Sequence, residues 1–142
     1  MSDKIFLDTN IVIYAHTDHD IVKQKKAQSL MTVQRVMIST QVLQEASNIL
    51  NKKLKHHWSD VAKVLNDLIA NTDVYTNNKN TVLKACYIAE HYKFSFYDSL
   101  IISAAIEAEA TILYSEDMQH NQLIEKQLKI INPFKIEGLT LT

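Results

Sequence analysis

The amino-acid sequence predicts an α/β protein in which a central parallel sheet carries helices on both faces. Short apolar or β-branched runs alternate with longer segments of helical periodicity, and this alternation is typical of that architecture. Apolar residues make up 46% of the 142 residues and charged residues 22%, the balance of an ordinary globular protein. A chain of this length can bury a core without disulfides or a structural metal, so we expect a single domain over residues 1–142.

Three short strands are predicted in the first half of the chain, over residues 5–7, 36–39 and 73–76. A helix is expected to start near Ile11, because the polar residues after the first strand favour a helix cap or a turn. Two more helices are predicted between the second and third strands, the later one following Ser59 as its N-cap. Their apolar residues have helical spacing: Val42, Ala46, Ile49 and Leu50 in one, and Val61, Val64, Leu65, Leu68 and Ile69 in the other.

The second half begins with two predicted helices, at about residues 80–91 and 96–109. A strand of β-branched and aromatic residues follows at 111–114, then a short helix from about Met118 and a last strand at 128–131. In a parallel sheet, ligand sites form beyond the carboxyl ends of the strands. Side chains that follow strands directly are therefore the first candidates for a functional site.

The composition excludes several classes of protein. The 15 Lys+Arg and 16 Asp+Glu residues nearly cancel, which excludes a strongly basic, histone-like binder and an acidic tail. The one cysteine, Cys86, excludes a disulfide framework and a cysteine zinc site, and we expect its thiol to be buried and inert. One glycine is too few for the glycine-rich loops of P-loop and dinucleotide-binding proteins. Without a signal peptide or a membrane-spanning run, we expect a cytoplasmic protein with no membrane partner.

Two carboxylates follow predicted strands. Asp8 comes directly after the first strand, and Asp117 comes shortly after the strand that ends at Tyr114. Each has an ordinary alternative role, because Asp at such positions also caps helices and forms turns. The sequence does not determine where the side chain of the neighbouring Glu116 points, because adjacent residues in a turn point in different directions. A doubly wound sheet would bring Asp8 and Asp117 to adjacent strand ends.

Two more carboxylates lie on predicted helices beside apolar side chains. At 100° per residue, Glu45 projects next to Val42 and Ile49, although a solvated carboxylate at the edge of the apolar stripe is the alternative. Asp98 lies on the same helix face as the apolar residues Ile101, Ile102 and Ala105. A carboxylate buried on that face needs a partner, a proton or a metal ion. Alternatively, Ser95 and Asp98 form a capping box that occupies this carboxylate.

The topology could deliver all four carboxylates to one crevice. Two carboxylates about 5 Å apart repel each other by about 3 kcal/mol at an effective dielectric constant near 20, so four together require a neutralising cation. Hard oxygen ligands completed by water favour Mg²⁺ or Mn²⁺. Such an ion activates water and stabilises charge on a phosphoryl group, which points to hydrolysis of a phosphodiester.

In their order along the chain, these motifs resemble the PIN domain family, and within it the VapC-type toxin ribonucleases. The matching segments are Phe6-Leu7-Asp8-Thr9-Asn10-Ile11, Gln44-Glu45-Ala46, Phe96-Tyr97-Asp98-Ser99-Leu100, Tyr114-Ser115-Glu116-Asp117-Met118-Gln119 and Asn132-Pro133-Phe134. Together they cover essentially the whole chain. Many relatives carry Gly where this chain has Asn121, and Asn is the residue that best replaces Gly in a left-handed turn.

The resemblance implies a PIN-like three-layer α/β/α fold and an Mg²⁺-dependent endoribonuclease, with Mn²⁺ as the other candidate ion. The implied catalytic acids are Asp8, Glu45, Asp98 and Asp117. Of these, Asp8, Asp98 and Asp117 would hold the metal, and Glu45 would help to bind it or position the attacking water. The implied supporting residues are Thr9, Asn10, Ser115 and Glu116. The implied partners are an RNA substrate, a second copy of the chain and an antitoxin, as in a type II toxin–antitoxin pair.

Two other functions use the same residues. A non-catalytic PIN-fold module would bind RNA or a protein without metal-dependent turnover. A phosphatase would use Asp8 as its nucleophile, but such enzymes usually carry a second Asp two residues later, where this chain has Asn10.

Two clusters of basic side chains could bind RNA phosphates, or they could simply be solvated. One cluster contains an aromatic residue and comprises Lys52, Lys53, Lys55, His56, His57 and Trp58. A second comprises Lys23, Lys25 and Lys26. A polar loop, rather than a metal site, is expected from His16, Asp18, His19 and Asp20.

Overall fold

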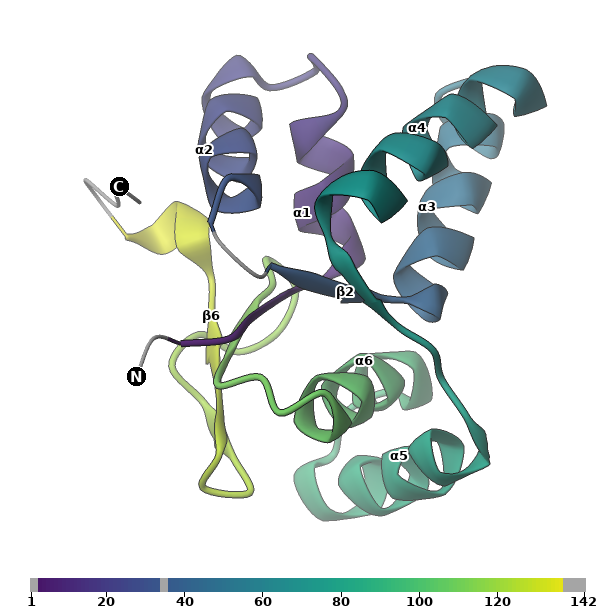
Figure 1. Cartoon of the computed structure of the whole chain (residues 1–142). Helices are drawn as coiled ribbons and strands as arrows, with labels where there is room; N and C mark the ends of the chain where they lie inside the picture. Colours follow the sequence, from purple (N-terminus) through teal and green to yellow (C-terminus); the bar gives the residue numbers. More distant parts are fainter. Residues whose placement is uncertain (1–2, 34–35, 137–142) are drawn as a thin grey trace.

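Helices cover both faces of a central sheet, as the sequence predicts. The computed structural model describes residues 3–33 and 36–136. Helices α1 (Thr9–Ala15), α2 (Ile21–Met31), α3 (Thr40–Lys52) and α4 (Trp58–Asn71) lie on one side, and α5 (Lys79–Tyr92) and α6 (Phe96–Glu107) on the other (Figure 1). The three-layer α/β/α prediction is therefore confirmed.

The sheet has six strands within the described residues. They are β1 (Ile5–Leu7), β2 (Met37–Ser39), β3 (Asp73–Tyr75), β4 (Ile112–Tyr114), β5 (Leu123–Ile124) and β6 (Leu128–Ile131). Their order is β3-β2-β1-β4-β6-β5, and all neighbours are parallel except β5 and β6. A 3₁₀ turn, η1 (Pro133–Lys135), follows β6.

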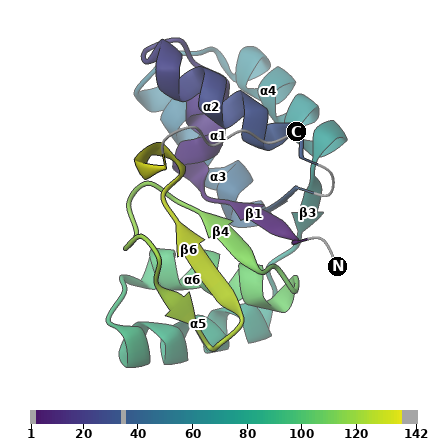
Figure 2. The same ribbon diagram turned by 90° about the vertical axis from the view of Figure 1, so that its left-hand side faces the viewer.

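The strand order places the carboxyl ends of β1 and β4 side by side. Leu7 is in register with Tyr114, and Figure 2 shows the two strands running next to each other with β6 beyond β4. Residues that follow these two strands therefore meet at one edge of the sheet, although about a hundred positions of sequence separate them.

The core explains why the central strands are continuously apolar. All three residues of β1 are buried, because helices cover both faces of a parallel sheet. In α6, eight consecutive residues from Ser99 to Ile106 are buried between the sheet and α5. This packing fixes the start of α6, where Asp98 lies, relative to the sheet edge.

Three local predictions are wrong, and one helix was not predicted. The helix predicted from Met118 is replaced by turns and by β5, because Asn121 adopts a left-handed φ of 70° and its N–H donates to the carbonyl of Ile130. Helix α2 is not predicted, and it buries only Ala27 and Leu30, too few for a clear periodicity.

The other two errors concern faces and caps. Helix α4 begins one residue before Ser59, with His57 as an N-cap that makes no side-chain hydrogen bond. Cys86 is exposed rather than buried, because α5 turns Thr81, Ala85 and Ile88 towards the core. None of the helices in residues 3–33 and 36–136 combines the length and apolar character that a membrane crossing requires.

Candidate functional site

Asp8 both caps a helix and faces the neighbouring strand end. Its backbone N–H donates to the carbonyl of Tyr114 at 3.0 Å, which continues the pairing of β1 with β4. One carboxylate oxygen accepts the N–H of Thr9 at 2.7 Å at the start of α1, and the other accepts the Ser115 hydroxyl at 2.8 Å. Only 6% of Asp8 is exposed. The capping role predicted as an alternative is therefore real, and it fixes the carboxylate at the sheet edge.

The environment of Asp8 disfavours its negative charge. Burial raises the pKa of this carboxyl from 3.8 to about 7, although the hydrogen bonds from Ser115 and Thr9 oppose the rise. The charges of Asp98 and Glu45 raise the pKa further, so these three carboxylates interact electrostatically. A cation bound among these carboxylates would lower their pKa values and favour the charged form.

Glu45 is tied to the segment that follows Asp8. The Thr9 hydroxyl donates to one Glu45 oxygen at 2.6 Å, and the Gln41 side chain approaches the other at 3.4 Å. Ser39 caps α3 and so sets the position of Glu45 along that helix. The carboxylate is therefore partly buried and held in place by two side chains at the edge of the apolar stripe.

Asp98 lies in the first turn of α6, with a partly buried side chain. The Ser95 hydroxyl accepts the Asp98 backbone N–H at 3.2 Å, which is one half of a capping box. The reciprocal bond from the Asp98 carboxylate to the Ser95 N–H is not formed among the described residues. Burial raises the pKa of Asp98, and the charges of Asp117 and Glu45 add to the rise.

Asp117 is exposed and lies in a turn, so its predicted helix-capping alternative is wrong. The Asn10 amide donates to the Asp117 carboxylate at 3.0 Å and accepts the Glu116 N–H at 3.3 Å. Asn10 therefore connects the start of α1 to the loop after β4. The structure places Thr9 in contact with both Asp8 and Glu45, Asn10 with Asp117, and Ser115 with Asp8.

Glu116 faces a lysine rather than the other acids. Its two carboxylate oxygens accept hydrogen bonds from the Tyr14 hydroxyl and from the Lys23 ammonium. Burial alone would raise the pKa of Glu116, but the hydrogen bonds of Lys23 and Tyr14 lower it below its ordinary value. The Glu116 side chain therefore points towards Tyr14 and Lys23, and it lines the site without facing the other acids.

The four candidate acids line one cleft of about 530 Å³, which we call the acidic cleft. Five further lining residues were not predicted for the site: Ile13, Tyr14, Asn48, Ile49 and Lys53. Helical spacing could have indicated Asn48 and Ile49, three and four positions after Glu45. Lys53 belongs to the first basic cluster, which the sequence indicates as a possible RNA contact, whereas Tyr14 carried no comparable signal.

The acidic cleft suits a divalent ion in chemistry and charge. Its donors are carboxylate oxygens, and none of the four acids forms an ion pair within the described residues. The same residues contain no group of three or more His, Cys, Asp or Glu side chains close enough to hold an ion as they stand. The ligands would therefore have to move closer to the ion or share it with water.

The chain was compared with known families and structures. The PIN domain family model matches residues 5–125. A toxin–antitoxin complex from Klebsiella pneumoniae is similar at 14% identity and a TM-score of 0.68, covering 93% of this chain and 99% of that one. VapC20 of Mycobacterium tuberculosis, described as a toxin that cleaves the sarcin–ricin loop, is similar at 20% identity and a TM-score of 0.67, covering 80% and 89%.

A third solved structure, DNA-bound VapBC from Salmonella typhimurium, is similar at 18% identity and a TM-score of 0.64, covering 91% of this chain and 97% of that one. No curated protein sequence matches the chain. At these identities the solved structures establish the shared fold.

Proposed function

The chain belongs to the PIN domain family, and we propose that it is a metal-dependent endoribonuclease that hydrolyses phosphodiester bonds in RNA. Its fold is that of the VapC-like PIN toxins. The observation that carries the proposal is the acidic cleft, where carboxylates from four separate segments of the chain meet. Like charges gathered in one cleft, one of them on the buried Asp8, are costly unless they bind a cation.

In this proposal, Asp8, Asp98 and Asp117 hold Mg²⁺, which Mn²⁺ can replace. The bound ion supplies activation of water and stabilises charge on the phosphoryl group. Ser115 and Asn10 orient two of these ligands through the hydrogen bonds described above. Such contacts around the ligands commonly set both the affinity for a metal and its position.

We assign Glu45 to the positioning of the attacking water. The Thr9 hydroxyl holds one of its oxygens at 2.6 Å and leaves the other with only the long contact to Gln41. That second oxygen can accept a hydrogen bond from water. Hydrolysis would leave a 5′-phosphate and a 3′-hydroxyl, as the family resemblance implies.

The phosphatase alternative is less well supported by this geometry. Phosphatases of that type usually carry a second Asp two residues after the nucleophile, and in this chain Asn10 occupies that position and donates its amide to Asp117 at 3.0 Å. An aspartyl-phosphate trapped on Asp8 would revive this alternative.

Cleavage of a labelled RNA tests the proposal. We expect product with Mg²⁺, none with EDTA, and a loss of about 100-fold or more in Asp8→Asn, because several kcal/mol of metal-supplied stabilisation disappear. Asp73→Asn is the matched control, since Asp73 is exposed at the amino end of β3. Undiminished cleavage by Asp8→Asn would refute the metal role. RNA binding without any Mg²⁺-dependent product would favour the non-catalytic module.

We further propose that the protein is the toxin of a type II toxin–antitoxin pair and forms a homodimer. Two of the similar structures are described as toxin–antitoxin or VapBC assemblies, which supports an antitoxin partner. Induced expression should arrest growth, and either Asp98→Asn or co-expression of the neighbouring gene should relieve the arrest. Normal growth with active protein present would contradict the toxin proposal, and light scattering measures the oligomeric state.

A further inference from the structure

A second cleft lies next to the acidic cleft and shares Lys53 with it. Its volume is about 500 Å³, and we call it the basic cleft. The loop after α1 and the loop after α3 supply most of its lining: His16, Asp18, His19, Lys53, Leu54 and His56. His16 is already engaged by the Val12 carbonyl at 3.0 Å and the Asp67 carboxylate at 3.4 Å. The Lys53 ammonium and the imidazoles of His19 and His56 remain beside the Asp18 carboxylate, and these groups suit an anion.

Backbone hydrogen bonds fix the loop after α3. The N–H of Leu54 donates to the carbonyl of Ile49 at 3.2 Å, and the N–H of His56 donates to that of Leu50 at 3.0 Å. Lys55 adopts a left-handed φ of 61° between them, and the Asn51 amide donates to the His56 carbonyl at 3.0 Å. His56 is therefore held in position before any ligand arrives.

His56 also has an unsatisfied buried nitrogen. Its Nδ1 atom is buried and has no hydrogen-bond partner among the described residues. Because this atom is buried, it is not open to a ligand, and Nε2 of the same ring is the nitrogen that can donate a hydrogen bond to a phosphate oxygen.

The structure distinguishes the two basic clusters that the sequence left equivalent. In the second cluster, Lys23 is bound to Glu116 and Lys26 donates to the carbonyl of Ile136 at 2.6 Å. Lys53, in contrast, forms no ion pair within the described residues. The basic cleft therefore offers a cation that is not already neutralised, directly beside the acids.

We propose that the basic cleft binds a phosphate of single-stranded RNA next to the phosphate that the acidic cleft cleaves. The inference rests on the proposed ribonuclease function. A polyanion that enters the acidic cleft meets repulsion from its carboxylates, and cations beside the cleft offset this repulsion. Lys53 lines both clefts, so the sugar–phosphate backbone of the RNA can extend from the acidic cleft into the basic cleft past this cation.

RNA binding in EDTA tests this inference separately from cleavage. The probe is a short fluorescein-labelled single-stranded RNA, and its anisotropy gives the Kd over a series of salt concentrations. Lys53→Gln and His56→Gln should each weaken binding about 5-fold, and Lys53→Gln should reduce the salt slope by about 0.7, the value for one lost phosphate contact on a single strand. Lys53→Arg, which keeps the charge, should retain the wild-type slope.

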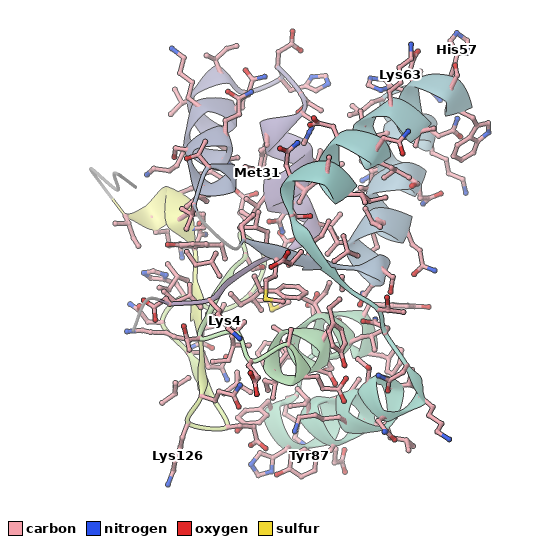
Figure 3. All side chains as sticks on the ribbon, in the orientation of Figure 1. Lys4, Met31, His57, Lys63, Tyr87 and Lys126 are labelled. Carbon is pink, nitrogen blue, oxygen red and sulfur yellow. The ribbon has the colours of Figure 1, made fainter. Side chains whose placement is uncertain are left out.

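Lys126→Gln is the matched control. Figure 3 shows Lys126 at the opposite end of the molecule from His57, the neighbour of His56, and this variant should bind RNA like the wild type. Thermal unfolding of every variant checks that the fold is kept.

Two outcomes would overturn the inference. Wild-type affinity and slope in both Lys53→Gln and His56→Gln, with Mg²⁺-dependent cleavage intact, would remove the basic cleft from the binding site and leave the proposed function standing. Competition by polyglutamate as effective as that by unlabelled RNA would assign the cleft to an acidic protein segment instead. A wild-type protein that neither binds nor cleaves RNA would refute the proposed function itself.

Discussion

At the scale of single residues, Asp8 makes the stability of the protein depend on pH. Its carboxyl is buried at the end of a strand, and two hydrogen bonds do not compensate for the loss of water around its charge. The pKa of Asp8 therefore lies at about 7 in the folded protein, against an ordinary value of 3.8. Between these values the folded state holds a proton that the unfolded chain has released.

The free energy of unfolding of the metal-free protein should therefore fall as pH rises from about 4 to about 7, by up to about 4 kcal/mol. Urea unfolding at about pH 5 and about pH 8 measures this fall. Asp8→Asn, which cannot ionise, should show a flatter pH dependence. Equal pH dependence in the wild type and this variant would contradict the assignment of the shift to Asp8.

The sequence predicts individual site residues where a carboxylate follows a strand or adjoins an apolar stripe. Asp8 and Asp98 gave that signal, and both prove to be at least partly buried in the acidic cleft. The partners of these acids are harder to predict. The contact of Lys23 with Glu116 joins residues 93 positions apart, and nothing local in either segment indicates it.

At the scale of elements, a small cluster fastens α1, α2 and η1 to the loop that carries Asp117. The Lys23 ammonium lies 5.0 Å from the ring centroid of Tyr14 and 5.2 Å from that of Phe134. The two rings pack edge to face at 5.3 Å. Because Lys23 also binds Glu116, one side chain connects all four segments.

Lys23→Met should lower the free energy of unfolding by about 1 kcal/mol, since the pair with Glu116 is only partly screened by water. It should also slow RNA cleavage, because the loop that carries Glu116 and Asp117 loses the hydrogen bond from Lys23 that holds it in position. Lys23→Arg should preserve both properties. Thermal unfolding and cleavage rates check the pair of variants, and unchanged values in Lys23→Met would exclude a positioning role.

Elements with a complete apolar pattern are predicted well, and elements defined by tertiary contacts are not. Strand β1 and helix α3 carry their periodicity in the sequence. Strand β5 has two residues and exists only through its antiparallel pairing with β6. Asn121 shows the intermediate case, because its left-handed φ was expected but the strand pairing that follows it was not.

At the scale of the whole molecule, the strand order converts distant motifs into one cleft. Placing β4 beside β1 brings Asp117 to Asn10, and helices from the two faces of the sheet add Glu45 and Asp98. The rule that ligands bind beyond the carboxyl ends of parallel strands made this convergence predictable. The basic cleft was not predictable, since it depends on how two loops meet in space.

Titration with Mn²⁺, followed by its electron paramagnetic resonance signal, tests the central claim most directly. If Asp8, Asp98 and Asp117 form one metal site, the wild type binds Mn²⁺, Asp8→Asn and Asp98→Asn lose about 10-fold or more in affinity, and Asp73→Asn does not. Wild-type Mn²⁺ affinity in both Asp8→Asn and Asp98→Asn, or no binding by the wild type, would contradict the account.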